Sequence, residues 1–216
     1  MENTVQTVSK RRSQERTEVT KAKLLDAAAM EFSTRGFDAV TIREIEIKAD
    51  VQRNLLRYHF GDKEGIWKAV VDREFELLWA ATDTGQELAQ EMLQDLPAHE
   101  RVAYRIRSYV KFSAEHPEFN RLMVQEGKQN SWRVEYLVDT YLRPAMEQLR
   151  ASVKEDINLS DEEFFHWYYM FVGGGALPFT MAPEAAYLFG VDVNDEEVIN
   201  RHAEMMVDFL LTRTSD

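Results

Sequence analysis

Residues 41–60 read Thr-Ile-Arg-Glu-Ile-Glu-Ile-Lys-Ala-Asp-Val-Gln-Arg-Asn-Leu-Leu-Arg-Tyr-His-Phe, a pattern typical of two short helices joined by a tight turn. Thr41 is a favourable N-cap, and Glu44, three residues later, completes a capping box. A second helix is expected over residues 53–59, with Leu56 as its buried anchor. The stretch therefore predicts a helix-turn-helix, an arrangement that can place one helix in the major groove of DNA.

The predicted second helix carries polar side chains suited to reading base edges. Gln and Asn can pair bidentately with adenine, and Arg with guanine. Neighbouring hydroxyl, imidazole and ammonium groups lie where phosphate oxygens would pass. The alternative is an ordinary three-helix packing unit with a polar face. The candidate DNA-contacting residues are Thr41, Arg43, Gln52, Arg53, Asn54, Arg57, Tyr58, His59 and Lys63.

The net charge of −12 argues against a nucleic-acid partner, because Lys and Arg supply most of the affinity for phosphates. The charge is unevenly distributed, however. Residues 1–68 carry a net charge of +2, and residues 69–216 carry −14. A DNA-reading head on an acidic body would show this polarity. The alternative is that the acidic surface serves only solubility.

The composition suits a soluble protein with a substantial core, since 44% of the 216 residues are hydrophobic and 30% are charged. No apolar run approaches the roughly 20 residues needed to span a bilayer, and no secretory signal is visible. The chain has no cysteine, which excludes disulfides and cysteine-based metal sites. A cytoplasmic location without a membrane partner is expected.

Apolar residues recur at helical spacing along almost the whole chain, and no strand pattern is visible. We therefore expect an all-α fold of about nine helices. Pro144 requires a kink or break in its helix. Residues 183–193 are expected to form a loop. The expected helices cover residues 17–34, 41–49, 53–59, 63–79 (extending toward 93), 100–115, 118–127, 132–157, 160–180 and 195–212.

The stretch from Thr20 to Val70 resembles the DNA-binding head of the TetR family of bacterial transcriptional regulators. The resemblance implies an all-helical homodimer whose heads read a palindromic operator as double-stranded DNA. It also implies a C-terminal body that binds a small-molecule effector, which weakens DNA binding. The residues that carry it are Leu24-Leu25-Asp26-Ala27-Ala28, Phe32, Arg35-Gly36-Phe37, Thr41-Ile42-Arg43-Glu44-Ile45, Ala49, Val51, Tyr58-His59-Phe60 and Lys63-Glu64.

The chain departs from the family pattern at the turn and on the reading helix. Asp50 stands where Gly is usual, although Asp can adopt left-handed backbone angles. Glu46 stands where Ala is common, and Asn54 replaces a frequent Gly. Leu55-Leu56-Arg57 replaces the more usual Thr-Leu-Tyr. An operator sequence therefore cannot be transferred by analogy.

Three segments are expected. Residues 1–16 contain Lys10-Arg11-Arg12 and are predicted to be a disordered basic arm, either touching DNA or acting as a solvated tail. Residues 17–68 form the predicted helix-turn-helix domain. Residues 69–216 form the predicted ligand-binding and dimerisation domain.

The body is rich in aromatic residues and methionine, which favours an apolar pocket between helices, although ordinary core packing is the alternative. Polar residues interleaved with these aromatics are the candidates for effector contact. The predicted pocket residues are Arg105, Tyr109, Phe112, His116, Gln125, Glu126, Trp132, Tyr136, Trp167 and Phe171.

Gly173-Gly174-Gly175 interrupts an aromatic-rich helix, where each Gly costs roughly 1 kcal/mol relative to Ala. The glycines either permit the close approach of another helix or end or kink their own helix. A helix that is apolar on two faces usually has two partners. An isologous dimer is therefore predicted through residues 160–181 and 195–212. Its predicted interface residues are Phe164, Trp167, Phe171, Gly174, Val198, His202, Met205 and Phe209.

The sequence shows no His pair at metal-site spacing and no nucleophile–base set. No catalytic residue, metal or cofactor is therefore predicted, and the chain is not expected to be an enzyme. The main hypothesis is a ligand-responsive DNA-binding regulator, in particular a repressor released by its effector. The alternatives are a helical enzyme or small-molecule carrier with a structural head, and a protein-partner adaptor.

Overall fold

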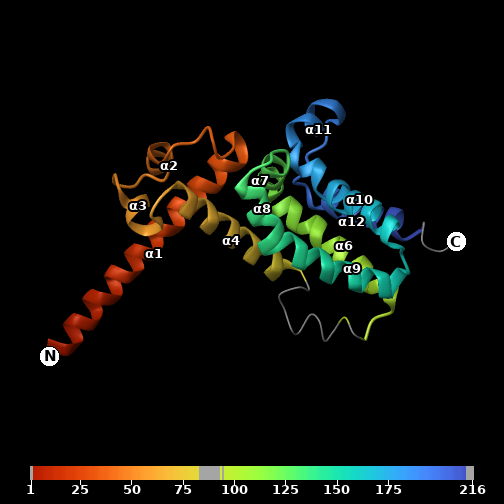
Figure 1. Cartoon of the computed structure of the whole chain (residues 1–216), viewed down its shortest axis with the longest axis horizontal. Coiled ribbons are helices and arrows are strands. Elements are labelled where there is room, and N and C mark those ends of the chain that lie inside the picture. Colours follow the sequence, from red (N-terminus) through yellow and green to blue (C-terminus); the bar gives the residue numbers. More distant parts are fainter. Residues whose placement is uncertain (1, 83–92, 94, 213–216) are drawn as a thin grey trace. The chain divides into compact units, whose positions relative to one another are not determined.

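The computed structural model describes residues 2–82, 93 and 95–212, and the elements assigned there are helices, with no strand (Figure 1). The all-α expectation is confirmed. The chain divides into two compact units, unit 1 (Met1–Arg73) and unit 2 (Glu74–Asp216). The elements are α1 (Glu2–Arg35), α2 (Ile42–Lys48), α3 (Leu55–Phe60), α4 (Lys63–Ala81), α6 (Ala98–Glu115), α7 (Pro117–Gly127), α8 (Trp132–Leu137), the π-helix η1 (Val138–Leu142), α9 (Arg143–Ile157), α10 (Asp161–Thr180), α11 (Ala182–Phe189) and α12 (Glu196–Thr212).

Unit 1 is held together by apolar side chains from each of its helices. Leu24, Ile45, Leu56 and Trp67 come from α1, α2, α3 and α4 respectively, and all have no exposed surface. An ion pair of 2.6 Å between the Arg73 guanidinium and the Asp26 carboxylate also joins α4 to α1. The short helices α2 and α3 are therefore fixed by packing, since helices of six or seven residues are not stable alone.

The prediction of a disordered arm over residues 1–16 is wrong for the described part, because α1 begins at Glu2. The chain contains no proline or glycine before Gly36, so nothing in the sequence terminates the helix toward the N-terminus. The boundary between units also falls after Arg73, within α4, and not after residue 68.

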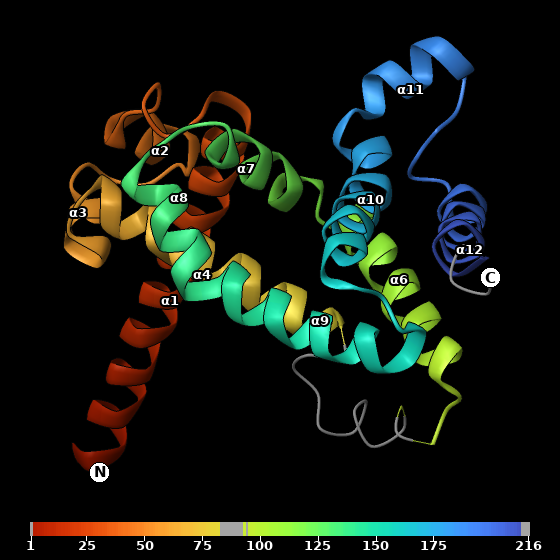
Figure 2. The ribbon, with the colours of Figure 1, turned by 45° about the vertical axis from the view of Figure 1, so that its right-hand side comes forward.

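In unit 2, α6 packs against α9, α10 and α12 (Figures 1 and 2). The shared core contains Ile106, Tyr109, Trp167 and Phe171, all buried. At the surface, the Arg107 guanidinium pairs with both carboxylate oxygens of Glu204, at 2.7 and 2.8 Å, and so joins α6 to α12. None of the described helices is long and apolar enough to cross a membrane.

Pro144 is accommodated by a π-helical turn. The predicted helix over residues 132–157 is divided into α8, η1 and α9, and Pro144 lies in the first turn of α9. Proline lacks an N–H and clashes with the carbonyl four residues earlier, so a regular α-helix cannot continue through it. The wider turn of η1 relieves this conflict, and the chain stays helical from α8 through η1 to α9 without a break.

The segment 183–193 was expected to be a loop, but most of it belongs to α11, which extends beyond the end of α10 (Figure 2). Pro183 lies in the first turn of α11, where its missing N–H costs nothing. Gly190 closes the helix in the left-handed conformation, with φ of 65°. The proline therefore marks the start of a helix here.

Two of the three glycines of α10, Gly174 and Gly175, allow neighbouring helices of the same chain to approach closely, whereas a Cβ atom on Gly173 would meet nothing within 4 Å. A Cβ atom on Gly174 would lie 2.8 Å from the Met206 methyl carbon, and one on Gly175 would lie 3.0 Å from the Tyr109 ring. His202 Nε2 lies 2.9 Å from the Gly174 carbonyl oxygen. The close-approach interpretation is therefore right, and α10 continues through the glycines to Thr180.

Candidate functional site

The N-terminus of α2 is fixed by a complete capping box. The Thr41 hydroxyl oxygen accepts a hydrogen bond from the Glu44 backbone N–H at 3.2 Å. The Glu44 carboxylate accepts from the Thr41 backbone N–H at 2.8 Å, and the Arg35 guanidinium donates to it at 2.9 Å. The predicted capping box is confirmed, and it ties the start of α2 to the end of α1.

This network predicts an acid-sensitive contribution to stability. Hydrogen bonds from the Thr41 hydroxyl and backbone N–H, followed by the bond from Arg35, lower the pKa of Glu44 from 4.5 to about 2. Because the folded pKa is depressed, this contribution is present above pH 4.5 and is lost as the pH falls toward 2. We expect Glu44→Gln to flatten the fall in unfolding free energy over that window, measured by urea unfolding at a series of pH values. An unchanged slope would contradict this account.

The turn between α2 and α3 uses two left-handed residues. Asp50 has φ of 52°, and Asn54 has φ of 72°. The Val51 N–H donates to the Glu46 carbonyl oxygen at 3.1 Å and closes the turn after α2. Because Asn54 is left-handed, α3 begins at Leu55, so the predicted start at residue 53 is wrong. Both departures from the family pattern, Asp50 and Asn54, retain the backbone geometry for which glycine is usually needed.

Glu46 connects the two helices from the interior of unit 1. Its side chain is only 2% exposed, and its carboxylate accepts a hydrogen bond from the Leu56 backbone N–H at 3.3 Å. The Arg43 guanidinium lies 3.6 Å from the other carboxylate oxygen. The first-turn N–H groups of a helix have no partner within that helix. The carboxylate of α2 therefore satisfies one such group in α3 and sets the angle between them.

Replacing Glu46 should loosen α3. Glu46→Ala leaves the Leu56 N–H without its acceptor in a buried position, and we expect a loss of about 1–3 kcal/mol in unfolding free energy. Glu46→Gln keeps a carbonyl acceptor and should lose much less. Urea unfolding together with hydrogen exchange of the Leu56 amide would measure both effects. Equal losses in the two variants would show that the Leu56 bond is not the cause.

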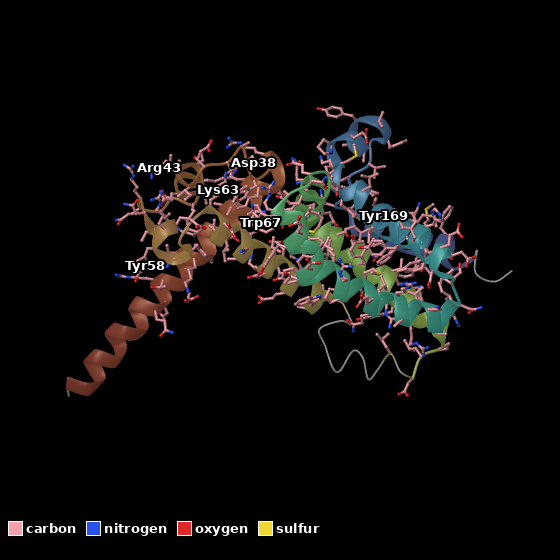
Figure 3. The ribbon with its side chains drawn as sticks, in the orientation of Figure 1. Asp38, Arg43, Tyr58, Lys63, Trp67 and Tyr169 are labelled. Carbon is pink, nitrogen blue, oxygen red and sulfur yellow. The ribbon has the colours of Figure 1, made fainter. Side chains whose placement is uncertain are left out.

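The predicted DNA-contacting residues of the turn and α3 are largely exposed. Tyr58 is 79% exposed, and the Arg43 side chain is 56% exposed. Figure 3 shows both at the outer edge of unit 1, with Trp67 inside it. Gln52, Arg53 and Asn54 precede α3 and do not form its first turn. The exposed members of the predicted set are Thr41, Arg43, Gln52, Arg53, Asn54, Arg57 and Tyr58.

His59 and Lys63 are half-buried. The His59 ring meets the Tyr58 ring edge-on, with centroids 4.9 Å apart. Burial and, after it, the nearby Lys21 charge lower the pKa of His59 and so disfavour the charged form of its ring. The Lys63 ammonium lies 4.3 Å from the centre of the Phe37 ring. His59 and Lys63 are therefore less accessible to solvent than the other seven predicted DNA-contacting residues.

Unit 2 contains a cavity of about 420 Å³ bounded by α4, α6, α7, α8, α9 and α10, with Leu142 from η1. Its wall is mainly apolar, and its polar members include Thr82, Arg105, Asn120 and Thr180. A volume of this size suits a small organic molecule. The apolar and aromatic wall includes Phe75, Leu78, Trp79, Tyr109, Phe119, Met123, Leu137, Met146, Tyr168, Tyr169, Phe171 and Leu177.

The sequence led us to expect an apolar cavity in the body, but only three of the ten predicted pocket residues line the cavity of unit 2. Arg105, Tyr109 and Phe171 do line it. Glu126 does not, because it is buried in an ion pair with Arg133 at 2.7 Å. The remaining predicted pocket residues do not line this cavity, since packing turns them into the core or toward other surfaces. They are Phe112, His116, Gln125, Trp132, Tyr136 and Trp167.

A group of possible metal ligands, which the sequence search missed, lies where α4 meets the α6–α7 junction. Ligand atoms of Glu74, His116 and Glu118 all lie within 4.8 Å of one another. His116 Nδ1 is 3.8 Å from a Glu118 carboxylate oxygen. Carboxylate and imidazole donors of this kind can bind divalent transition metals. Spacing in the sequence could not reveal the group, because Glu74 reaches it through tertiary packing.

The predicted dimer helices carry exposed apolar side chains: on α12 these include the predicted Met205 and Phe209, but on α10 they lie on another face than expected. Phe164, Trp167 and Phe171 are buried within unit 2, so their prediction as interface residues is wrong. Gly174, Val198 and His202 are half-buried. Because α10 is apolar all round, the sequence could not show which face met the core. The exposed apolar residues are Phe165, Tyr169, Met170, Leu177 and Met181 near α10, Tyr187, Leu188 and Phe189 on α11, and Met205 and Phe209 on α12.

The chain resembles known regulators in sequence and fold. The profile of the tetR family of bacterial regulatory proteins matches residues 24–70. YttP of Bacillus subtilis, named a probable HTH-type transcriptional regulator, is 29% identical over 128 residues, which is 57% of this chain and 58% of the relative. BetI of Paraburkholderia phymatum, an HTH-type transcriptional regulator, is 31% identical over 65 residues, which is 30% of this chain and 33% of the relative.

The two matches span less than two thirds of each relative's length. The structural similarity to solved proteins covers a larger share of the chain than the sequence similarity does. A TetR-like transcriptional regulator from Rhodococcus sp. RHA1 superposes with a TM-score of 0.61 at 20% identity, covering 90% of this chain and 94% of its own. The named relatives are transcriptional regulators, and regulators of this family are not enzymes, as predicted. Residues 24–70 of the chain therefore match the tetR family of bacterial regulatory proteins, and the helical fold of the chain is similar to that of a TetR-like regulator.

Proposed function

We propose that this protein is a DNA-binding transcriptional regulator that recognises a palindromic operator as a homodimer and is released from it by a small-molecule effector. One observation carries the proposal. A capped, rigidly buttressed helix-turn-helix presents Gln52, Arg53, Arg57 and Tyr58 to solvent around α3. These side-chain types read base edges and phosphates.

The exposed apolar residues of α10 and α12 support a dimer. Phe165 and Tyr169 on α10 are 57% and 60% exposed, and Met205 and Phe209 on α12 are 64% and 65% exposed. Large apolar side chains gathered on two helices mark an interaction surface. In a two-fold dimer the same surface of each subunit meets its counterpart. Two heads would then address two half-sites of one operator.

The cavity in unit 2 supports regulation by a ligand. Phe75, Leu78 and Trp79 line it from α4, and residues 63–73 of the same helix belong to unit 1. A ligand that binds one position of α4 better than another shifts the population between them. We propose that this shift changes the spacing of the two reading helices, which must match successive major grooves about 34–36 Å apart.

Selection of bound duplexes from a random pool tests the proposal. We expect enrichment of an inverted repeat with half-site centres about one or more helical turns apart. The affinity for the selected duplex should fall steeply as the salt concentration rises, because phosphate contacts release counterions. Failure to retain any duplex at low salt would overturn the proposal.

A further inference from the structure

Asn120 is the most informative polar residue of the cavity wall. It lies on α7 and is 5% exposed. Its side-chain oxygen Oδ1 accepts a hydrogen bond from the Tyr109 hydroxyl at 3.1 Å. Its Nδ2 group has no hydrogen-bond partner in the described part of the chain. The Tyr109 hydroxyl uses the acceptor side of the Asn120 amide, and the donor side is left unpaired.

An unsatisfied buried donor is costly, because it has lost water and gained no acceptor. Buried polar groups in native proteins nearly always have partners, so an exception calls for an explanation. Burial raises the pKa of Tyr109, which keeps its hydroxyl neutral and able to donate. An acceptor oxygen on a bound molecule would complete the hydrogen bonding of Asn120.

Other polar groups of the wall already use their donors. The Thr82 hydroxyl donates to the Leu78 carbonyl oxygen at 2.9 Å, and the Thr180 hydroxyl donates to the Ala176 carbonyl oxygen at 2.9 Å. The hydroxyl proton of each threonine is therefore already used in a hydrogen bond to the backbone carbonyl four residues earlier. Asn120, in contrast, is a lining residue with an unpaired donor, Nδ2.

The charge of the wall restricts the guest further. Among the described lining residues there is no Asp, Glu, Lys or His, and Arg105 supplies a positive charge. A cationic guest would meet no compensating carboxylate, and burying its charge would be unfavourable. A neutral or anionic guest would meet no carboxylate among the described lining residues. The volume of 420 Å³ corresponds to roughly fourteen groups of water size, at about 30 Å³ each.

We propose that the cavity of unit 2 binds an apolar acyl compound, a carboxylate or an ester, whose carbonyl-type oxygen accepts a hydrogen bond from Asn120 Nδ2. The tail lies against the aromatic and aliphatic wall. The acid and the ester share this acceptor chemistry, and binding measurements separate them. The inference rests on the proposed function only in that this molecule would be the effector.

The test measures binding of three probes of matched length to the full chain without DNA. The probes are decanoate, methyl nonanoate and decylammonium, each below its critical micelle concentration. Binding is followed by thermal shift and by the fluorescence of Trp79, which lines the cavity. We expect at least one acyl probe to bind, and the cation not to bind at the same concentrations. Stronger binding of decanoate would identify a free acid, and stronger binding of methyl nonanoate a neutral acyl group. Binding of decylammonium as tight as that of both acyl probes would overturn the proposal, as would no binding of either acyl probe.

The double variant Tyr109→Phe/Asn120→Leu removes both hydrogen-bonding partners and keeps the apolar volume, so it is expected to fold. Its dissociation constant for the bound acyl probe should rise about tenfold. Gln125→Leu is the matched control, because it makes the same amide-to-leucine change on α7 at a residue that does not line the cavity, and it should leave the affinity unchanged. Unaltered affinity in the double variant would overturn the role of Asn120.

Failure of the proposed ligand chemistry and failure of the proposed function give different experimental results. If acyl probes bind and the affinity for the selected duplex is unchanged, the ligand chemistry stands and the effector role fails. If a duplex is selected but neither acyl probe binds, DNA recognition stands and the ligand chemistry fails.

Discussion

Arg57→Glu should abolish specific duplex binding, with a loss of at least about 100-fold in affinity. Arg57 is exposed on α3 and follows the buried anchor Leu56 directly. A correct bidentate Arg–guanine pair contributes about 1–3 kcal/mol of discrimination. A carboxylate at the same place would lose that pair and repel the phosphates. Fluorescence anisotropy with the selected duplex would measure the loss.

Further variants separate base reading by Arg57 from a general effect of charge on DNA binding. Arg57→Ala should relax preference at one base pair, whereas a change in a phosphate contact weakens all duplexes alike and lowers the salt slope by about one. Arg143→Glu is the matched control, since Arg143 is an exposed arginine of unit 2. It should retain wild-type affinity. Equal losses in Arg57→Glu and Arg143→Glu would show that net charge alone, not α3, governs binding.

The double variant Phe165→Glu/Phe209→Glu should convert the protein to monomers and weaken operator binding by about 100-fold or more. Both side chains are exposed, at 57% and 65%, so the fold of the single chain does not depend on them. Carboxylates at a two-fold interface would lie near their own copies without compensation. Linking two heads raises affinity by about 10²–10⁴ without any new contact, and monomers lose that gain.

Analytical ultracentrifugation would measure the association, and anisotropy the affinity. Tyr104→Glu provides a control, because Tyr104 is also an exposed aromatic residue of unit 2 but lies on α6. It should remain dimeric. A double variant that stays dimeric, with normal operator affinity, would place the interface elsewhere. Loss of dimers with unchanged operator affinity would show that one head suffices.

The features that the sequence predicted well are those set by neighbouring residues. The capping box of Thr41 and Glu44, the left-handed Asp50 and the buried Leu56 depend on backbone geometry and short-range spacing. Pro144 likewise indicated a local departure from regular α-helix, which the structure shows as the π-helical turn η1. Errors arose where one local pattern fits two structures. Pro183 reads equally as a loop residue or as the first turn of a helix, and it begins α11.

The candidate cavity shows the limit of sequence reasoning. Apolar periodicity predicted a pocket in the body, but α10 is apolar all round, so Trp167 and Phe171 could not be assigned to core, cavity or interface. The structure buries both and gives only Phe171 to the cavity. Asn120 carried no pattern that would have selected it. Its meaning comes from burial, from the Tyr109 bond and from an unsatisfied Nδ2.

The sequence by itself determined the all-helical class, the helix-turn-helix within residues 41–60 and the concentration of acidic charge behind residue 68. These follow from propensity, capping and composition, which act over a few residues. Only the tertiary structure decided that Glu46 holds α3, which aromatic residues face solvent, and that Asn120 Nδ2 is buried without a partner. The physical reason is that burial and hydrogen-bond satisfaction are properties of residues brought together from separate helices.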